Sequence, residues 1–393
     1  MYGVSTINFS KSDSTVYAIF GLMICSAPFY WLQLYGGNTV YYFLIGALLA
    51  CTGVLVLLDY SHFRLSIVYL LLFLLMLLGF CIIAFAHGNG GLESEMLRYN
   101  AGFLVKCSMV LILISSDRKY LFANLYVKLS VILSILVLVT LMMVLLGFWP
   151  FEYYHQPLPN KYVYNFITTF SSSVRVFGSV EYPRMSSFLD EPGSFSFMLA
   201  IAILINNRFT RLKHAEIILI TTGLLTFSLA FFIFTFLYIF FKDSKRSHVA
   251  FYYVTIAVVT TFLYVVSDMF ASLLDQILFR MTWDDDKGSI GGDNRFISAQ
   301  FPKDMIFGDG LIGGRDSIIG EVNNIGVFGL LISYTPLYVI AFRSLIYREL
   351  ARDAAFLVCV FALLLQRPAL EKLYVFLPLY YYMHAMSYGY RKT

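Results

Sequence analysis

Apolar runs near or above the length needed to cross a lipid bilayer recur along this chain. A transmembrane helix needs about 18–20 apolar residues to cross a hydrocarbon core of about 30 Å. Only 13% of the residues are charged, whereas soluble globular chains carry about 25%. The chain lacks the polar residues to cover a water-facing surface, and we therefore expect an integral membrane protein.

Helices are the expected form of these runs, because each backbone N–H and C=O in lipid must be satisfied within its own segment. A transmembrane β-barrel would show alternating segments of about 10 residues, and the runs do not alternate. We expect spans at residues 15–35, 39–58, 65–86, 101–115, 125–148, 193–207, 214–227, 229–241, 249–270, 323–342, 353–366 and 370–388. The predicted fold class is an all-α integral membrane bundle of about twelve transmembrane helices.

The segment 214–241 could be one long helix or a hairpin of two short ones. The basic residues that flank it are Arg208, Arg211 and Lys213 before it and Lys242, Lys245 and Arg246 after it. The positive-inside bias keeps both clusters in the cytoplasm, which requires a hairpin that turns near Ser228. Both termini are then cytoplasmic. Residues 1–393 form one membrane domain, with long outer loops at 149–192 and 271–322.

Composition also bounds the function. The formal net charge of +4 is too small to indicate a nucleic-acid partner, and the five cysteines all lie within apolar runs, which argues against a disulfide framework. The first apolar run is too long for a signal-peptide core and is expected to be the first span. The histidines show no spacing typical of zinc ligands.

The first outer loop ends in Arg184, Asp190, Glu191 and Pro192 before a predicted helix. Asp190 suits the N-cap and Pro192 the first turn, where a missing N–H costs nothing. The positive end of this helix dipole faces the outer side, so an anion could dock there beside Arg184. The alternative is a capped helix with a surface arginine.

The second outer loop combines glycines with Asn294, Arg295 and Arg315, and ends near Glu321 and Asn323. Exposed backbone N–H groups and guanidinium forks suit a diphosphate. The alternative is a set of ordinary turns whose arginines pair with neighbouring aspartates. For Asp284–Asp286, a solvated acidic turn is favoured over a divalent-cation site. Residues 273–281 have the apolar spacing of an amphipathic interfacial helix.

Two further features have a structural and a functional interpretation. Lys106 lies within the short span 101–115, five residues from its predicted outer end, where it could either reach the interface or serve in function. Tyrosine clusters at residues 153–164 and Tyr380–Tyr382 are expected to anchor at membrane edges. The first cluster could instead stack on sugar rings.

The order of these motifs resembles the superfamily of O-antigen polymerases and O-antigen ligases. The stretches that carry the resemblance are Arg184–Pro192, Thr226-Phe-Ser228, Asn294-Arg295, Gly308-Asp-Gly310 and Ile325-Gly-Val-Phe-Gly329. The resemblance implies a GT-C-like membrane glycosyltransferase of the bacterial inner membrane, with its active site facing the periplasm. It implies no metal, no nucleotide and no other cofactor.

By this resemblance, Arg184, Arg295 and Arg315 bind the diphosphate of an undecaprenyl-diphosphate-linked oligosaccharide. Asp190, Asn294, Asn323 and Lys106 are expected to support the site. Ligases of the superfamily carry a histidine where this chain has Glu321, Asn323 and Asn324, which favours a polymerase. The catalytic base stays open between Glu191 and Glu321; a helix N-terminus lowers a carboxylate pKa, which makes Glu191 the weaker base.

The expected function is therefore polymerisation of a surface polysaccharide by transfer of a lipid-linked glycan onto a sugar hydroxyl of another lipid-linked repeat unit. A chain-length regulator and a flippase are expected partners. An O-antigen ligase or an oligosaccharyltransferase with the same donor is the nearest alternative. A lipid-linked oligosaccharide flippase is the alternative from another class, and it should carry charged or broken helices at mid-membrane.

Overall fold

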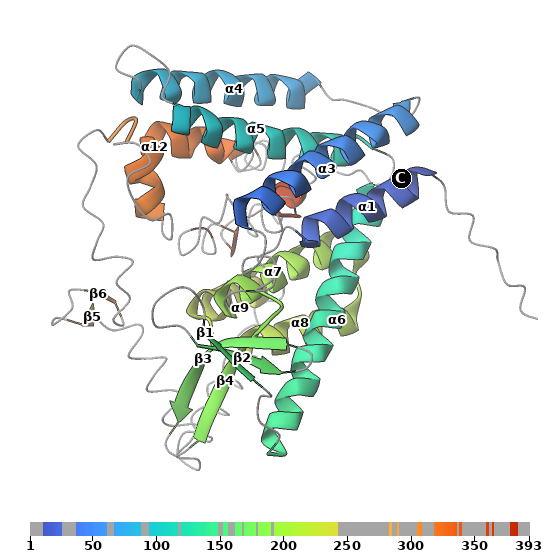
Figure 1. The fold of residues 1–393 in the computed structure, drawn as a ribbon, viewed down its shortest axis with the longest axis vertical. Helices are drawn as coiled ribbons and strands as arrows, with labels where there is room; N and C mark the ends of the chain where they lie inside the picture. Colours follow the sequence, from blue (N-terminus) through green and yellow to red (C-terminus); the bar gives the residue numbers. More distant parts are fainter. Residues whose placement is uncertain are drawn as a thin grey trace, which may run out of the picture.

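The computed structural model of this chain is mostly helical (Figure 1). It describes residues 11–25, 37–60, 67–87, 94–116, 119–147, 152–155, 162–166, 169–177, 180–189, 192–242, 283–284, 289–290, 305–308, 318–335, 338–339, 359–360, 364 and 378–383. The predicted span 249–270 and the predicted interfacial helix 273–281 lie outside these residues.

Five helices form the N-terminal part of the bundle. They are α1 (Lys11–Cys25), α3 (Gly37–Leu58), α4 (Ile67–His87), α5 (Ser94–Ser115) and α6 (Lys119–Leu145). Helix α1 packs on α3 and α6, and α5 packs on α3 and α4. The predicted spans 39–58, 65–86 and 125–148 are confirmed as helices. Among the described residues, one helical stretch, Tyr120–Leu145, meets the length and hydropathy expected of a membrane span.

The segment predicted to turn near Ser228 is a hairpin. Helix α8 (Lys213–Leu224) and helix α9 (Leu229–Lys242) are separated by a turn in which Phe227 has a φ of 50°. The far ends of the two helices meet, because the Lys242 ammonium forms an ion pair with Glu216. The hairpin is therefore antiparallel, and Lys213 and Lys242 lie at one end of it.

Helix α7 (Pro192–Ile205) leads into this hairpin through the π-helical turn η2 (Asn206–Thr210). The buried side chain of Asn206 holds the turn closed: its Nδ2 donates to the Leu212 carbonyl at 3.0 Å, and its Oδ1 accepts from the Leu212 N–H at 3.0 Å. These bonds replace helix bonds that the chain loses where it reverses. Helix α7 packs on α6, α8 and α9.

The expectation of an all-α fold is wrong for the first long loop. Four strands, β1 (Glu152–His155), β2 (Tyr162–Phe166), β3 (Thr169–Phe177) and β4 (Val180–Ser187), form an antiparallel sheet in the order β1-β2-β3-β4. Aromatic and β-branched residues are frequent in β2 and β3, and such residues favour strands. Strands β3 and β4 pack against α6 and α7 (Figure 1). In the second loop, β5 (Trp283–Asp284) pairs with β6 (Ser289–Ile290).

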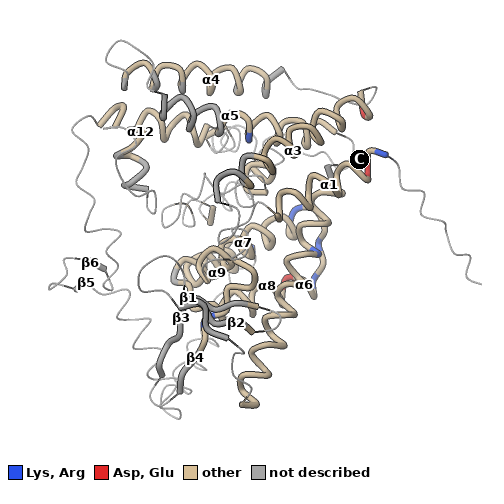
Figure 2. Tube along the Cα trace, in the orientation of Figure 1, with Lys and Arg blue, Asp and Glu red and all other residues tan. Residues whose placement is uncertain are grey.

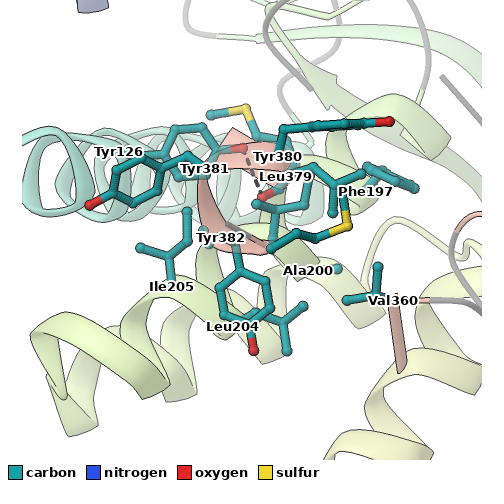
Figure 3. Close-up of a cluster of buried hydrophobic side chains, with 14 of the residues drawn as sticks. Tyr126, Phe197, Ala200, Leu204, Ile205, Val360, Leu379, Tyr380, Tyr381 and Tyr382 are labelled. Carbon is teal, nitrogen blue, oxygen red and sulfur yellow. Dashed lines mark hydrogen bonds between the residues drawn. The ribbon is translucent and has the colours of Figure 1, made fainter. Parts of the chain in front are cut away.

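The C-terminal tyrosines are core residues, not interfacial anchors as predicted. Tyr380, Tyr381 and Tyr382 are at most 1% exposed. Figure 3 shows them beside Tyr126 of α6 and side chains of α7 such as Leu204. The Tyr380 hydroxyl donates to the Ser333 carbonyl of α12 (Ile318–Ser333), and the Tyr381 ring contacts Phe122 at a centroid distance of 5.1 Å. Because its polar hydroxyl has a partner, Tyr380 can be buried without penalty.

The hairpin yields a prediction about Gly223. A Cβ at this position would lie 2.0 Å from the ring of Phe231, so α8 and α9 approach each other only because the side chain is absent. Gly223→Ala is expected to lower the melting temperature in detergent, since overpacking costs about 1–3 kcal/mol. Thermal unfolding of purified protein measures this loss.

Gly53→Ala is the matched control, because nothing lies within 4 Å of a Cβ at Gly53. Alanine is about 1 kcal/mol more favourable than glycine inside a helix, so this variant should be at least as stable as the wild type. The second change Phe231→Leu should restore part of the stability lost in Gly223→Ala. Equal melting temperatures for the two glycine variants would contradict the contact.

Candidate functional site

Arg184 of β4 is buried and binds the turn of the helical hairpin. It is 9% exposed. Its Nε donates to the Thr226 carbonyl at 2.9 Å, and Nη2 donates to the Phe227 carbonyl at 3.1 Å. A guanidinium out of water must be hydrogen-bonded, because burying an unpaired charge is costly. Two motifs that are far apart in the sequence, Arg184–Pro192 and Thr226–Ser228, therefore meet.

The turn presents carbonyls because α8 ends there. The last carbonyls of a helix have no intrahelical partner, and a positive charge beside them is favourable. The Thr226 N–H bonds to the Gly223 carbonyl at 3.2 Å, and the Phe227 N–H bonds to the Leu224 carbonyl at 3.1 Å. These bonds direct the chain back on itself and leave the Thr226 and Phe227 carbonyls to accept from Arg184.

The chain after Arg184 passes directly to the start of α7. Ser186 and Ser187 are buried, Ser187 has a φ of 55°, and Thr169 of β3 donates to the Ser187 carbonyl at 3.3 Å. Pro192 begins α7, as predicted. Asp190 and Glu191 lie outside the described residues. Arg184 lies on β4, and β4 packs on α7.

The other predicted site residues are not gathered around Arg184 in the described structure. Asn294, Arg295 and Arg315 lie outside the described residues. Glu321 and Asn323 are in the first half of α12, which packs on α4. In Figure 1, α12 lies beside α4 and α5 and away from β4. The structure therefore does not bring Glu321 next to Arg184.

Lys106 does not lie near a helix end as predicted. Helix α5 begins at Ser94, earlier than the predicted residue 101, so Lys106 lies well inside the helix. Its side chain is 7% exposed and interacts with other groups in the structure. A buried ammonium is retained only where it is paired. The structure therefore places Lys106 inside the protein, and the predicted position near a membrane interface is wrong.

Two contacts join loops near the start of α6. Asp59 accepts a hydrogen bond from the Ser116 hydroxyl at 2.7 Å, so the chain after α3 meets the chain after α5. Tyr120 at the start of α6 contacts Phe209 of η2 at 6.2 Å between ring centroids. Several of the Lys and Arg positions lie along α6 near α1 (Figure 2). The alternation of the predicted spans puts these loops on the cytoplasmic side.

Sequence reasoning missed two positions. Asp59 is buried, but its partner Ser116 is 57 residues away and no local pattern joins them. Gly326 interrupts α12 with a φ of 67° and a ψ of 178°. The stretch 325–329 carries part of the resemblance, but its local sequence assigns Gly326 no physical role. No cluster of three or more His, Cys, Asp or Glu side chains suited to a metal ion occurs in the described part of the chain.

Comparisons of the chain with protein-family models, with curated proteins and with solved structures found no match.

The geometry of Arg184 yields a prediction about stability. Arg184→Ala removes the guanidinium donors of the Thr226 and Phe227 carbonyls, and losing a donor to a buried carbonyl costs about 1–3 kcal/mol. The variant is expected to unfold at a lower temperature in detergent than the wild type. Arg211→Ala is the matched control, because Arg211 is exposed at the opposite end of α8, and its melting temperature should be unchanged. A wild-type melting temperature for Arg184→Ala would refute this structural role.

Proposed function

We propose that the chain is a polytopic membrane protein of about twelve helices. Support comes from large apolar side chains that the described helices leave exposed. They include Phe43, Leu57 and Leu58 of α3, Leu71, Leu78 and Phe85 of α4, and Ile132, Met142 and Leu145 of α6. A helix that is hydrophobic all round is typical of a protein core or of a membrane span, and lipid tails would cover these side chains without penalty.

Helix α6 sets the position of the proposed membrane. Its 27 residues give a length of about 40 Å. The exposed residue Lys128 lies near its start, and the exposed residues from Ile132 onward are apolar. A lysine at this place can extend its ammonium to the headgroups. We therefore place the cytoplasmic boundary of an inner membrane near Lys128 and the sheet toward the periplasmic end of α6.

Labelling of single cysteines tests this topology. In a background with Cys25, Cys51 and Cys81 replaced by alanine, Leu212→Cys and Met305→Cys introduce exposed thiols in two segments that the sequence predicts on opposite faces. An impermeant maleimide is expected to label Cys at 212 only in inverted vesicles and Cys at 305 only in right-side-out vesicles. Labelling of both positions from the same side would contradict the topology.

We propose that the protein is a metal-independent glycosyltransferase that polymerises a surface polysaccharide, such as an O-antigen. The observation that carries this proposal is the bond of Arg184 to the Thr226 and Phe227 carbonyls. It joins two motifs of the resemblance, and the buried arginine lies on the strand that precedes α7 and packs on it. A helix N-terminus and a guanidinium both favour an anion such as a diphosphate.

The proposed reaction breaks the bond between the anomeric carbon of the donor glycan and its undecaprenyl diphosphate. A sugar hydroxyl of a second lipid-linked repeat unit forms the new glycosidic bond and gives its proton to a carboxylate. The leaving diphosphate carries the negative charge, which Arg184, Arg295 and Arg315 stabilise. Glu191 directly precedes α7, whereas Glu321 lies on α12 away from β4. The base of the proposed reaction stays open between Glu191 and Glu321, and only Glu191 belongs to the same sequence motif as Arg184.

Polymer formation by purified protein tests the function. With lipid-diphosphate repeat units, the wild type should give a ladder of chain lengths. Arg184→Ala and Arg295→Ala should each lower the rate by at least about 100-fold, the order of loss when one charge-stabilising donor is removed. Arg211→Ala is the control and should retain the ladder. Because Arg184 also stabilises the fold, rates are compared at equal amounts of folded protein. Wild-type ladders from both site variants would show that the site assignment is wrong.

A flippase for lipid-linked oligosaccharides is the second candidate, because α12 is interrupted at Gly326 and broken helices are typical of transporters. A flippase would change the leaflet from which the glycan is accessible without forming new glycosidic bonds. A ligase or an oligosaccharyltransferase would require a different acceptor, such as lipid A–core or a protein, and would transfer the chain to it. The same reaction mixtures distinguish these products.

A further inference from the structure

Four consecutive exposed side chains join η2 to α8, and we call them the basic turn: Arg211, Leu212, Lys213 and His214. The apolar Leu212 is 44% exposed and lies between two permanent positive charges in the sequence. One turn along α8 from Lys213, the apolar Ile217 is 65% exposed. Cationic and apolar side chains are therefore exposed together at this end of the hairpin.

One buried side chain holds the backbone of the basic turn. Asn206 is 1% exposed, and its carboxamide bonds to both the N–H and the carbonyl of Leu212 at 3.0 Å. Its backbone carbonyl accepts a hydrogen bond from the Arg211 N–H at 2.6 Å. Because these bonds already fix the backbone, a ligand that binds the exposed side chains does not have to order the turn.

An aromatic contact anchors the segment that leads into the basic turn. The Phe209 ring of η2 contacts Tyr120 at 6.2 Å and Tyr381 at 5.8 Å between centroids. Tyr381 is fully buried, and η2 packs on both α6 and α7. The segment is therefore attached to the core through Phe209, which leaves the side chains of the basic turn on the outside.

The backbone of Arg211 is in a conformation that suits glycine better than arginine. Its φ of 53° lies in the left-handed region, which disfavours residues with a Cβ. A turn that only had to reverse the chain would be more stable with glycine at this position. The chain instead keeps an exposed guanidinium there, and a strained backbone that carries such a group points to a use for the side chain.

The charge of the basic turn complements an anion at a membrane surface. The nearest acidic residue in the sequence, Glu216, forms an ion pair with Lys242 and is already neutralised. Figure 2 shows Lys and Arg positions gathered where α8 lies beside α6. Clustered cations attract the anionic lipids of the cytoplasmic leaflet, and exposed Leu212 and Ile217 suit the acyl boundary below the headgroups. A free anion would be matched by the cations alone.

We propose that the basic turn binds the headgroups of anionic phospholipids, with Arg211 and Lys213 at the phosphates and Leu212 in the acyl boundary. The binding rests on the proposed membrane topology, which puts the turn at the cytoplasmic leaflet, and not on the polymerase activity. It holds the end of the short hairpin that the Glu216–Lys242 ion pair closes. The lipid therefore stabilises the folded bundle.

Thermal unfolding of the full chain in a neutral detergent, with added phosphatidylglycerol, tests this binding. A lipid that binds only the folded state raises the melting temperature, so phosphatidylglycerol should raise it and phosphatidylcholine should not. Arg211→Gly relaxes the turn and removes a cation. Its melting temperature without lipid should be at least that of the wild type, but half of the rise should need about fivefold more phosphatidylglycerol. Lys213→Gln should need about fivefold more as well, and the two changes together about 25-fold.

Lys11→Gln is the matched control, because Lys11 is also an exposed lysine at the first residue of a helix. It should keep the lipid dependence of the wild type. An equal loss in Lys11→Gln would show that only net charge matters and would overturn the site. An equal rise with phosphatidylcholine, or with inorganic phosphate in place of lipid, would also overturn it. Absence of polymer would overturn the proposed function, while the lipid titration would still decide this binding.

Discussion

The packing of the described helices depends on the short hairpin of α8 and α9, which side-chain contacts hold at both of its ends. Helices α8 and α9 have 12 and 14 residues, which gives lengths of about 18 and 21 Å. Neither could cross a hydrocarbon core of about 30 Å alone. The Glu216–Lys242 ion pair joins their outer ends, and Arg184 binds the turn between them. A buried guanidinium is costly without partners, so this contact couples the sheet and the hairpin.

The difference in helix length explains where the sheet lies. Helix α6 is about 40 Å long and α7, with 14 residues, is about 21 Å long. Strands β3 and β4 pack beside the lower part of α6, below the short helices (Figure 1). In the proposed membrane, Arg184 would therefore lie below the outer surface that α6 reaches. A charge at such depth is a functional candidate by default, and a lipid-linked diphosphate could approach it from the bilayer.

Two parts of the structure now carry the proposed interactions. One is the junction of β4, α7 and the hairpin turn around Arg184. The other is the basic turn, which Asn206 holds at the opposite end of α8. Both use ends of α8, where backbone groups need partners from outside the helix. The Arg184 guanidinium supplies them at one end, and the Asn206 carboxamide supplies them at the other.

The sequence by itself determined the positions of most helices, because apolar runs and flanking charges act locally. The predicted hairpin at 214–241 illustrates this, since charge bias alone required the turn that the structure has at Phe227. It also indicated Pro192 as the start of α7. It did not reveal the sheet at 152–187, because the tyrosine-rich stretches were attributed to a membrane interface and strand pairing depends on partners along the chain.

Only the tertiary structure decided which of these elements meet. The burial of Tyr380–Tyr382, the Asp59–Ser116 bond and the place of Lys106 inside α5 depend on segments that are distant in sequence. The same holds for Gly326, whose required conformation is visible only when Ile306 lies against it. A local sequence pattern indicates the secondary structure and the degree of burial that each residue favours. Many arrangements of the helices and strands would satisfy these local preferences. Side-chain packing between residues that are distant in sequence determines which arrangement forms.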